Sequence, residues 1–192
     1  MNQSIKIPIN TAAIKKYRVL LMILFCCISY SSYSQKIALK TNAVLWATVS
    51  PNLSAEFVVS PNMSVDLSAS FNVWSPYSGI KTDHVSVSPE FRYWFGRPMA
   101  QHFLGVTLLY MNYDMGYKGT LYDGQALGGG ITYGYDFVLG KHWNLELTAG
   151  VGAMFHWQYR YKEEAPRPAD YNSFGWNAVP VKLGVNISYV IF

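Results

Sequence analysis

Residues 143–161 carry the clearest alternation of apolar and polar side chains in the sequence. The odd-numbered positions are all apolar or aromatic: Trp143, Leu145, Leu147, Ala149, Val151, Ala153, Phe155, Trp157, Tyr159 and Tyr161. The even-numbered positions are polar or small, with the single exception of Met154. Because successive side chains of a β-strand point to opposite faces, this pattern predicts one strand with an apolar face and a polar face. The strand is longer than the usual length of about 5–6 residues, and it suits a tilted crossing of a bilayer, which takes about 9–11 residues.

The same alternation predicts seven further strands, at residues 36–46, 53–59, 63–73, 84–95, 102–113, 125–139 and 176–192. The strand at 102–113 alternates poorly, so its two faces stay unassigned. Pro89 lies inside the fourth strand, where it removes a backbone donor and predicts a local bulge. We therefore predict an all-β fold, namely an eight-stranded antiparallel up-and-down transmembrane β-barrel of the outer-membrane type.

The connections between the predicted strands differ in length at the two ends of the barrel. The links after the second, fourth and sixth strands are brief, whereas those after the third, fifth and seventh are longer, and the first is short and contains Pro51. Outer-membrane barrels have short periplasmic turns, long extracellular loops and an even number of strands. The pattern therefore predicts that both termini lie at the short-turn end and that the long loops are extracellular.

Alternation alone does not decide which face is inside. A soluble periplasmic barrel of the lipocalin type would bury its apolar face. The interior of an eight-stranded barrel is just wide enough to be filled by side chains, and the apolar faces here carry many large rings, such as Trp143, Phe155 and Trp157. The opposite faces consist mostly of Gly, Ser, Asn and Thr. Side-chain volume therefore favours an apolar face turned toward lipid, with the soluble barrel as an alternative.

With this orientation, eight charged residues face the lumen: Lys40, Glu56, Asp66, Glu90, Arg92, Asp136, Glu146 and Lys182. Charges buried in a narrow interior must be paired. Since both signs are present, we predict a lumen charge network that plugs and stabilises the barrel. A proton or ion path is the alternative interpretation, although eight strands leave no open aqueous channel.

The positions of the aromatic residues predict where the strands cross the two interfaces of a membrane. Tyr and Trp form girdles at the two interfaces of membrane proteins. In the strand at 143–161, Trp143 marks the short-turn end, and Trp157, Tyr159 and Tyr161 mark the long-loop end. The alternative for any one of these rings is packing within a loop.

The N-terminal residues predict a secretory signal. Lys15, Lys16 and Arg18 precede the apolar run 19–28, and small and polar residues follow. This order of charged, apolar and cleavage regions is typical of a signal peptide, and the apolar run is too short for a helix that spans a bilayer, which takes about 20 residues. We therefore predict that residues 1–34 are a signal peptide and that residues 35–192 form a single β-barrel domain.

Removal of this segment changes the charge balance. The whole chain has 15 Lys and Arg against 11 Asp and Glu, for a net charge of +4, and four of the basic residues precede residue 35. The remaining chain is therefore formally neutral and does not predict nucleic-acid binding, which requires a clustered basic face. Both cysteines, Cys26 and Cys27, also precede residue 35, so we expect neither a disulfide nor a thiolate metal site in the rest of the chain.

The residues capable of catalysis form a weak pattern. His84 and Ser86 share a strand face and would suit a lipid A-modifying outer-membrane enzyme, which is an alternative function. Glu90 lies on the same face but roughly 13 Å along the strand from Ser86, too far to orient His84. The other histidines have no neighbours at the spacing of a metal site. We therefore expect no enzyme activity, and we assign no catalytic, cofactor-binding or metal-binding residue.

The last strand resembles the terminal-strand signal that is read by the barrel-assembly machinery. The resemblance is carried by residues 182–189, Lys-Leu-Gly-Val-Asn-Ile-Ser-Tyr, and by the terminal phenylalanine. It implies an assembly signal made of Gly184, Ile187, Tyr189 and Phe192. In most such barrels the aromatic residue of the motif is the last residue, whereas Tyr189 lies three positions earlier.

The chain after the predicted signal also resembles a Bacteroidetes family, domain-of-unknown-function family 3575. The residues that carry this resemblance are Lys40-Thr41-Asn42, Pro51-Asn52-Leu53 with Glu56, and the run from Pro89 to Phe95. The resemblance implies a small outer-membrane β-barrel with no established activity, and members are said to occur beside fimbria-like genes. We therefore expect a structural or surface-interaction role in the bacterial outer membrane, with lipid, the barrel-assembly machinery and a surface or fimbrial protein as partners.

Overall fold

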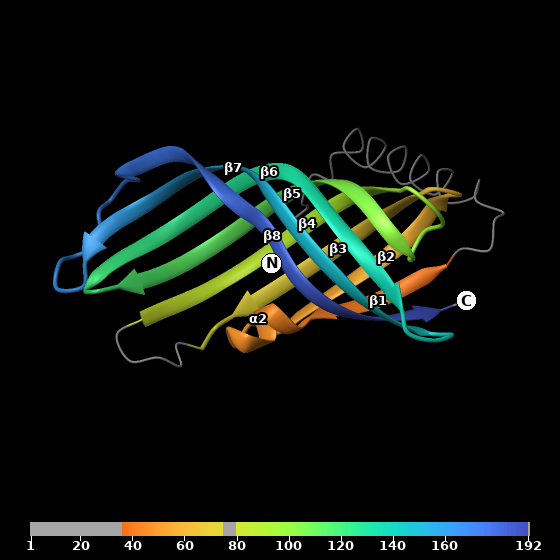
Figure 1. Cartoon of the computed structure of the whole chain (residues 1–192). Coiled ribbons are helices and arrows are strands. Elements are labelled where there is room, and N and C mark those ends of the chain that lie inside the picture. Colours follow the sequence, from red (N-terminus) through yellow and green to blue (C-terminus); the bar gives the residue numbers. More distant parts are fainter. Residues whose placement is uncertain (1–35, 75–79, 192) are drawn as a thin grey trace, which may run out of the picture. The chain divides into compact units, whose positions relative to one another are not determined.

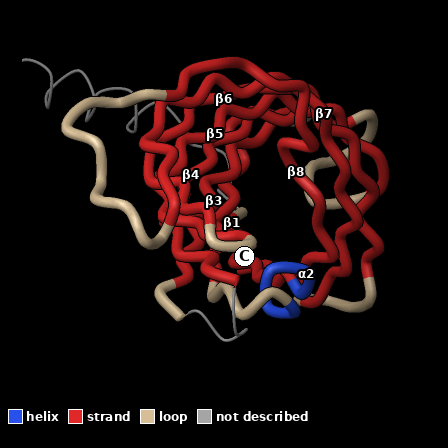
Figure 2. Tube along the Cα trace, turned by 90° about the vertical axis from the view of Figure 1, so that its left-hand side faces the viewer, coloured by secondary structure: helices blue, strands red, loops and turns tan. Residues whose placement is uncertain are grey.

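The computed structural model describes residues 36–74 and 80–191. Its elements are β1 (Ile37–Asn42), α2 (Ala43–Ala47), β2 (Asn52–Ser60), β3 (Met63–Asn72), β4 (Ile80–Trp94), β5 (Gln101–Tyr117), β6 (Thr120–Val138), β7 (Trp143–Lys162) and β8 (Ser173–Ile191). Each strand pairs with its neighbours in sequence, β8 returns to β1, and every pairing is antiparallel (Figure 1). The strands follow one another around a closed ring (Figure 2). The predicted all-β, eight-stranded, up-and-down fold is confirmed.

Two of the sequence predictions fall beyond these residues. The predicted signal peptide at 1–34 and the terminal residue Phe192 lie outside the described part of the chain. Within residues 36–74 and 80–191, no helix is both long and apolar enough to cross a membrane.

The apolar face of the barrel points outward. Large hydrophobic side chains such as Leu53, Ile131 and Val151 are exposed, and Val151 exposes 74% of its surface. The opposite face is buried and carries mostly small, polar or charged residues, together with a few large rings such as Trp94 and Phe103. The apolar face of the strands therefore points outward, as side-chain volume predicts. A soluble barrel of the lipocalin type would have the opposite arrangement, with its apolar face inside.

The first strand is shorter than the alternation predicts. β1 ends at Asn42 instead of continuing to residue 46, and the chain turns into the short helix α2. The side chain of Asn42 caps this helix by accepting a hydrogen bond from the Val44 backbone N–H at 3.0 Å. Trp46 is anchored by a hydrogen bond from its indole N–H to the Thr41 hydroxyl at 2.7 Å. A local cap thus overrides an alternating pattern.

The prediction of a long loop after the fifth strand is wrong. β5 and β6 continue through this region and are joined by Lys118 and Gly119 alone, both of which have positive φ (50° and 73°). Two such residues form the tight turn that matches the twist of a hairpin. Longer links on that end follow β1, β3 and β7, so the difference in loop length is smaller than predicted. Ile37 pairs with Ile191, which places the first and last residues of the strand ring at the opposite end, as expected.

The structure assigns the faces of β5. Phe103, Gly105 and Thr107 are buried, whereas Leu104 and Leu108 are exposed. The sequence obscures this pattern because two adjacent leucines, at 108 and 109, belong to opposite faces.

The bulge predicted at Pro89 is also wrong, because the β4 register is unchanged across it. Ser88 compensates for the lost backbone donor by donating a hydrogen bond from its hydroxyl to the Leu108 carbonyl oxygen at 2.8 Å. A register shift occurs instead between β7 and β8, where Gly150 pairs with Lys182 and Val151 pairs with Pro180.

Candidate functional site

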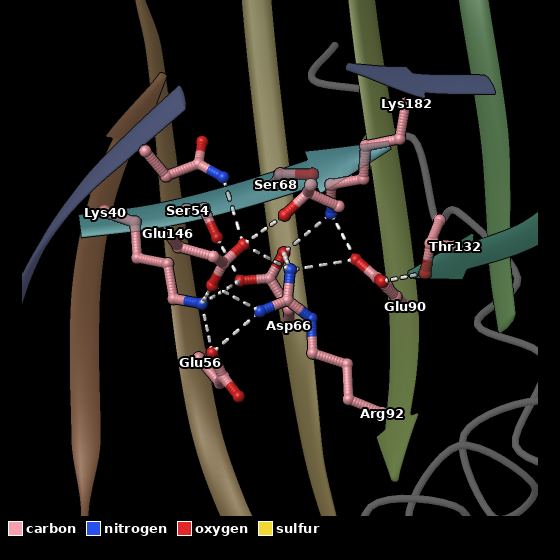
Figure 3. A network of polar contacts seen from close by, with 12 residues as sticks. Lys40, Ser54, Glu56, Asp66, Ser68, Glu90, Arg92, Thr132, Glu146 and Lys182 are labelled. Carbon is pink, nitrogen blue, oxygen red and sulfur yellow. Dashed lines mark hydrogen bonds and ion pairs between the residues drawn. The ribbon is translucent and has the colours of Figure 1, made fainter. Parts of the chain in front are cut away.

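Seven charged side chains, six of them buried and Lys182 partly exposed, meet inside the barrel and form what we call the charge network. Its members are Lys40 of β1, Glu56 of β2, Asp66 of β3, Glu90 and Arg92 of β4, Glu146 of β7 and Lys182 of β8 (Figure 3). These residues lie up to 142 positions apart in the chain, and strand alternation turns all of them inward. The network therefore connects strands from opposite parts of the ring.

Arg92 lies at the centre of the charge network. Its Nη1 atom lies 3.0 Å from Oε2 of Glu56 and 2.8 Å from Oε2 of Glu146. Its Nη2 atom lies 3.0 Å from Oε2 of Glu90 and 3.7 Å from Oδ2 of Asp66. A guanidinium group presents donors in a rigid plane, so one arginine can hold several carboxylates in fixed positions. Arg92 is fully buried, and its charge is therefore balanced by the protein alone.

The two lysines extend the network on either side of Arg92. Lys40 forms ion pairs with Glu56 and Glu146, and Lys182 forms ion pairs with Glu90 and, at 3.1 Å, with Asp66. The Lys40 side chain is 2% exposed, whereas that of Lys182 is 13% exposed and is the most accessible of the seven. Each glutamate of the network therefore contacts Arg92 and one lysine, whereas Asp66 contacts Arg92 and both lysines.

Hydroxyl and amide groups satisfy the remaining carboxylate oxygens. Ser64 donates to Glu56, Ser54 to Asp66, and Thr132 to Glu90. Glu146 accepts hydrogen bonds from the Thr148 hydroxyl at 2.7 Å and from the Asn186 amide at 3.0 Å. Burying a charge is unfavourable unless it is both paired and hydrogen-bonded, and these contacts meet both conditions.

Two aromatic residues support the network, and the sequence analysis missed them. Phe103 lies beneath the guanidinium group, with its ring centroid 4.3 Å from Cζ of Arg92. Trp94 packs against Phe103 at 4.7 Å and donates its indole N–H to Ser64 at 2.7 Å. Trp94 could have been found from its parity, because it follows Arg92 by two positions on the same strand. Phe103 could not, because the faces of β5 were unassigned.

Asp136 does not join the charge network, although the sequence analysis grouped it there. Its Oδ2 atom accepts a hydrogen bond from the Asn144 amide at 3.0 Å, and that amide also donates to the Met99 carbonyl oxygen at 2.9 Å. Asp136 pairs with Glu146 across β6 and β7, but its side chain forms no ion pair with the seven network residues. It instead helps to fix the chain between β4 and β5, which contains Met99.

The predicted girdle residues differ in their surroundings. Trp143 is 54% exposed near the short-turn end and packs edge-on against Tyr189 at 5.1 Å. Trp157, Tyr159 and Tyr161 are half-buried at the other end. Tyr159 in particular contacts the β7–β8 loop, since its ring lies 4.4 Å from that of Tyr171. For Tyr159 the structure therefore favours the alternative of a ring packed against a loop.

The described residues of the predicted assembly signal lie on both faces of β8. Gly184 is buried, whereas Ile187 and Tyr189 are exposed by 46% and 40%. A side chain at position 184 would crowd the Asn186 amide, because an added Cβ would lie 2.9 Å from its Nδ2 atom. The glycine therefore makes room for a side chain that binds Glu146.

The two side chains considered for catalysis have separate partners. Nδ1 of His84 lies 3.0 Å from the Thr82 carbonyl oxygen, and the Ser86 hydroxyl shares a hydrogen bond with Ser70 at 2.7 Å. Among the described residues, no group of three or more His, Cys, Asp or Glu side chains is arranged to hold a metal ion.

Comparison with known proteins identifies the family of the chain. A search of curated proteins found no match. The family described as "Protein of unknown function (DUF3575)" matches residues 20–191, which is most of the chain. The chain therefore belongs to the DUF3575 family, as the residues quoted from its first, second and fourth predicted strands suggested.

Proposed function

We propose that this protein is an outer-membrane β-barrel with a structural or surface-interaction role. The observation that carries the proposal is the inverted arrangement of side chains around a closed ring, with Val151 and its apolar neighbours outside and Arg92 with its carboxylates inside. A soluble protein rarely leaves a continuous apolar belt exposed to water. A lipid-facing apolar band around a polar interior is the usual design of outer-membrane barrels.

The charge network supports a structural role for the interior. Its ion pairs cross the lumen and fill the space that an open channel would require (Figure 3). The interior of an eight-stranded barrel is just wide enough for side chains or one small ligand, and it leaves no open aqueous channel. We therefore propose a plugged barrel whose surface contacts, rather than conduction, carry its function.

The proposed partners follow from the two ends and the outer wall of the barrel. Lipid covers the apolar wall, and the barrel-assembly machinery reads β8. The links after β1 and β7 lie at the end opposite the termini, and we propose that this end contacts a surface or fimbrial protein. Since His84 and Ser86 have separate hydrogen-bond partners, the role we propose is non-catalytic.

Cysteine labelling on intact cells tests this orientation. Glu164 lies exposed in the β7–β8 loop, and Lys141 lies exposed in the β6–β7 turn at the other end. We expect Glu164→Cys to react with a membrane-impermeant maleimide on intact cells, and Lys141→Cys to react only after the outer membrane is permeabilised. The two native cysteines, Cys26 and Cys27, fall within the predicted signal peptide. After cleavage of that peptide, the introduced cysteine would carry the thiol that reacts with the maleimide. Labelling of Lys141→Cys on intact cells as strongly as Glu164→Cys would contradict the proposed orientation.

A further inference from the structure

A cavity of about 220 Å³ lies inside the barrel between the charge network and α2. Network residues such as Lys182 line one side of it, and Leu45 of α2 lines another. The walls include the aliphatic side chains of Leu109, Met111 and Val181. Serine, asparagine and histidine residues also line the cavity, but most of its accessible wall surface is apolar, and charged groups lie at one end.

The cavity also reaches the outer surface of the barrel between β2 and β8. Its lining includes Leu53 of β2 and Leu183 of β8, which point outward and are 61% and 62% exposed. β1 would have to lie between these strands, but it ends at Asn42, whose last partner on β8 is Asn186. Beyond that pair, residues 173–185 of β8 pair with β7 alone among the described strands. We call this gap the lateral opening.

A side chain, rather than a strand, marks the edge of the lateral opening. The Asn42 amide donates to the Leu183 carbonyl oxygen at 3.0 Å, and its oxygen accepts from the Val185 backbone N–H at 3.2 Å. The Asn42 backbone in turn binds the Asn52 side chain on β2, at 2.6 Å from its N–H and 3.1 Å from its carbonyl oxygen. These bonds fasten β2 to β8 at one edge of the lateral opening. Beyond that edge β8 has no partner on this side among the described strands, and the short helix α2 contacts β8 instead of a strand.

The serine hydroxyls of the cavity wall all have hydrogen-bond partners, whereas the buried Nε atom of Arg92 has none among the described residues. Ser70 and Ser86 hydrogen bond with each other, and the Ser88 hydroxyl donates to a backbone carbonyl. A lysine ammonium carries three donors, and among the described residues Lys182 directs two of them to Asp66 and Glu90. One donor of Lys182 therefore remains for an oxygen atom of a ligand.

The charge balance indicates what kind of oxygen this would be. The network contains four carboxylates and three cations, a formal excess of one negative charge. An anionic ligand would add a second uncompensated charge in a buried space, which is unfavourable. An uncharged oxygen, such as that of an alcohol or ester, can accept the Lys182 hydrogen bond without this cost.

We propose that the cavity binds an aliphatic chain bearing an uncharged oxygen, which enters through the lateral opening and hydrogen bonds to Lys182. The volume lies below the roughly 300–1,000 Å³ of sites for drug-sized ligands, so the occupant is a small molecule or a single chain of a larger lipid. Binding by the cavity does not depend on the membrane location proposed above, whereas access from lipid does.

Photolabelling of the full chain tests this proposal. The probe is a decanol that carries a diazirine, and it is added to the barrel held in an amphipathic polymer. We expect adducts in the peptide containing Leu109 and Met111, and we expect excess unlabelled decanol to suppress them. Leu109→Trp, which fills the cavity, should reduce these adducts at least about tenfold, because a close-packed interior leaves no second space. Leu108→Trp on the exposed face is the matched control and should leave them unchanged.

Two further arms identify the ligand chemistry. The corresponding diazirine-labelled decanoate should give at least about tenfold fewer adducts than the alcohol, since it brings a buried negative charge. A phosphatidylcholine with the diazirine on its acyl chain, in vesicles containing the barrel, reports access of a lipid chain. Adducts from both the alcohol and the lipid assign a lipid chain, and adducts from the alcohol alone assign a free small molecule.

Three outcomes would overturn the proposal. These are adducts confined to the outer wall, adducts that persist in folded Leu109→Trp, and equal labelling by the decanoate. If Leu109→Trp does not fold, the competition by unlabelled decanol on the unchanged chain decides, because labelling that resists competition excludes a saturable cavity site.

Discussion

Replacing Arg92 with methionine is expected to lower the free energy of unfolding of the barrel by about 3–5 kcal/mol. Arg92 contacts Glu56, Glu90 and Glu146 at 2.8–3.1 Å inside the barrel, and it is fully buried. Its loss leaves four buried carboxylates with two lysines. Breaking a buried ion pair on one side is costly because the remaining charges keep their desolvation penalty without their partner. Denaturant unfolding of the barrel in phospholipid vesicles measures the effect.

Arg167→Met is the matched control for this variant. Arg167 forms an ion pair with Asp123 at 2.8 Å, but its side chain is 53% exposed. An exposed ion pair contributes about 0–1 kcal/mol, so this variant should unfold almost as the unchanged protein does. Equal losses in the two variants, or a loss below about 1 kcal/mol for Arg92→Met, would contradict a stabilising charge network.

Replacing Val151 with arginine is expected to lower the free energy of unfolding in vesicles by about 2–4 kcal/mol. Val151 lies near the middle of β7, pairs with Ile131 in the middle of β6 and is 74% exposed on the outer wall. If lipid covers this wall, the new guanidinium group must lose its hydration or distort the bilayer around it. The same vesicle-based unfolding experiment measures this loss.

Leu139→Arg is the control for depth. Leu139 is 67% exposed but lies in the turn after β6, at the end of the barrel. An arginine near the interface costs about 0–1 kcal/mol, because its head group reaches water. A loss that is the same at both positions would argue against a lipid-facing middle of β7.

The sequence predicts the strand ring and most of the charge network through a single rule. Side chains two positions apart share a face, so Glu90 and Arg92 could be placed together, and each network residue could be assigned to the polar face of its strand. The rule does not predict how far apart two side chains on the same face lie along the barrel axis. Asp136 shares the correct face but lies nearer the turn, where Asn144 binds it in place of a cation.

The wrong predictions have local causes. β1 ends early because the Asn42 side chain caps α2, and an alternating pattern does not reveal a cap. The β5–β6 loop closes into a two-residue turn because Lys118 adopts a positive φ, which is uncommon for a lysine. The lateral opening follows from the early end of β1, so it could not be predicted before that end was known. The cavity depends on side chains from both sides of this gap, which no single strand pattern contains.

Fractionation of cells that express the full chain tests the central claim of a lipid-covered apolar exterior most directly. We expect the protein in the membrane pellet, retained after an alkaline carbonate wash and released by detergent. Recovery in the soluble periplasmic fraction without detergent would contradict a barrel whose outer wall faces lipid.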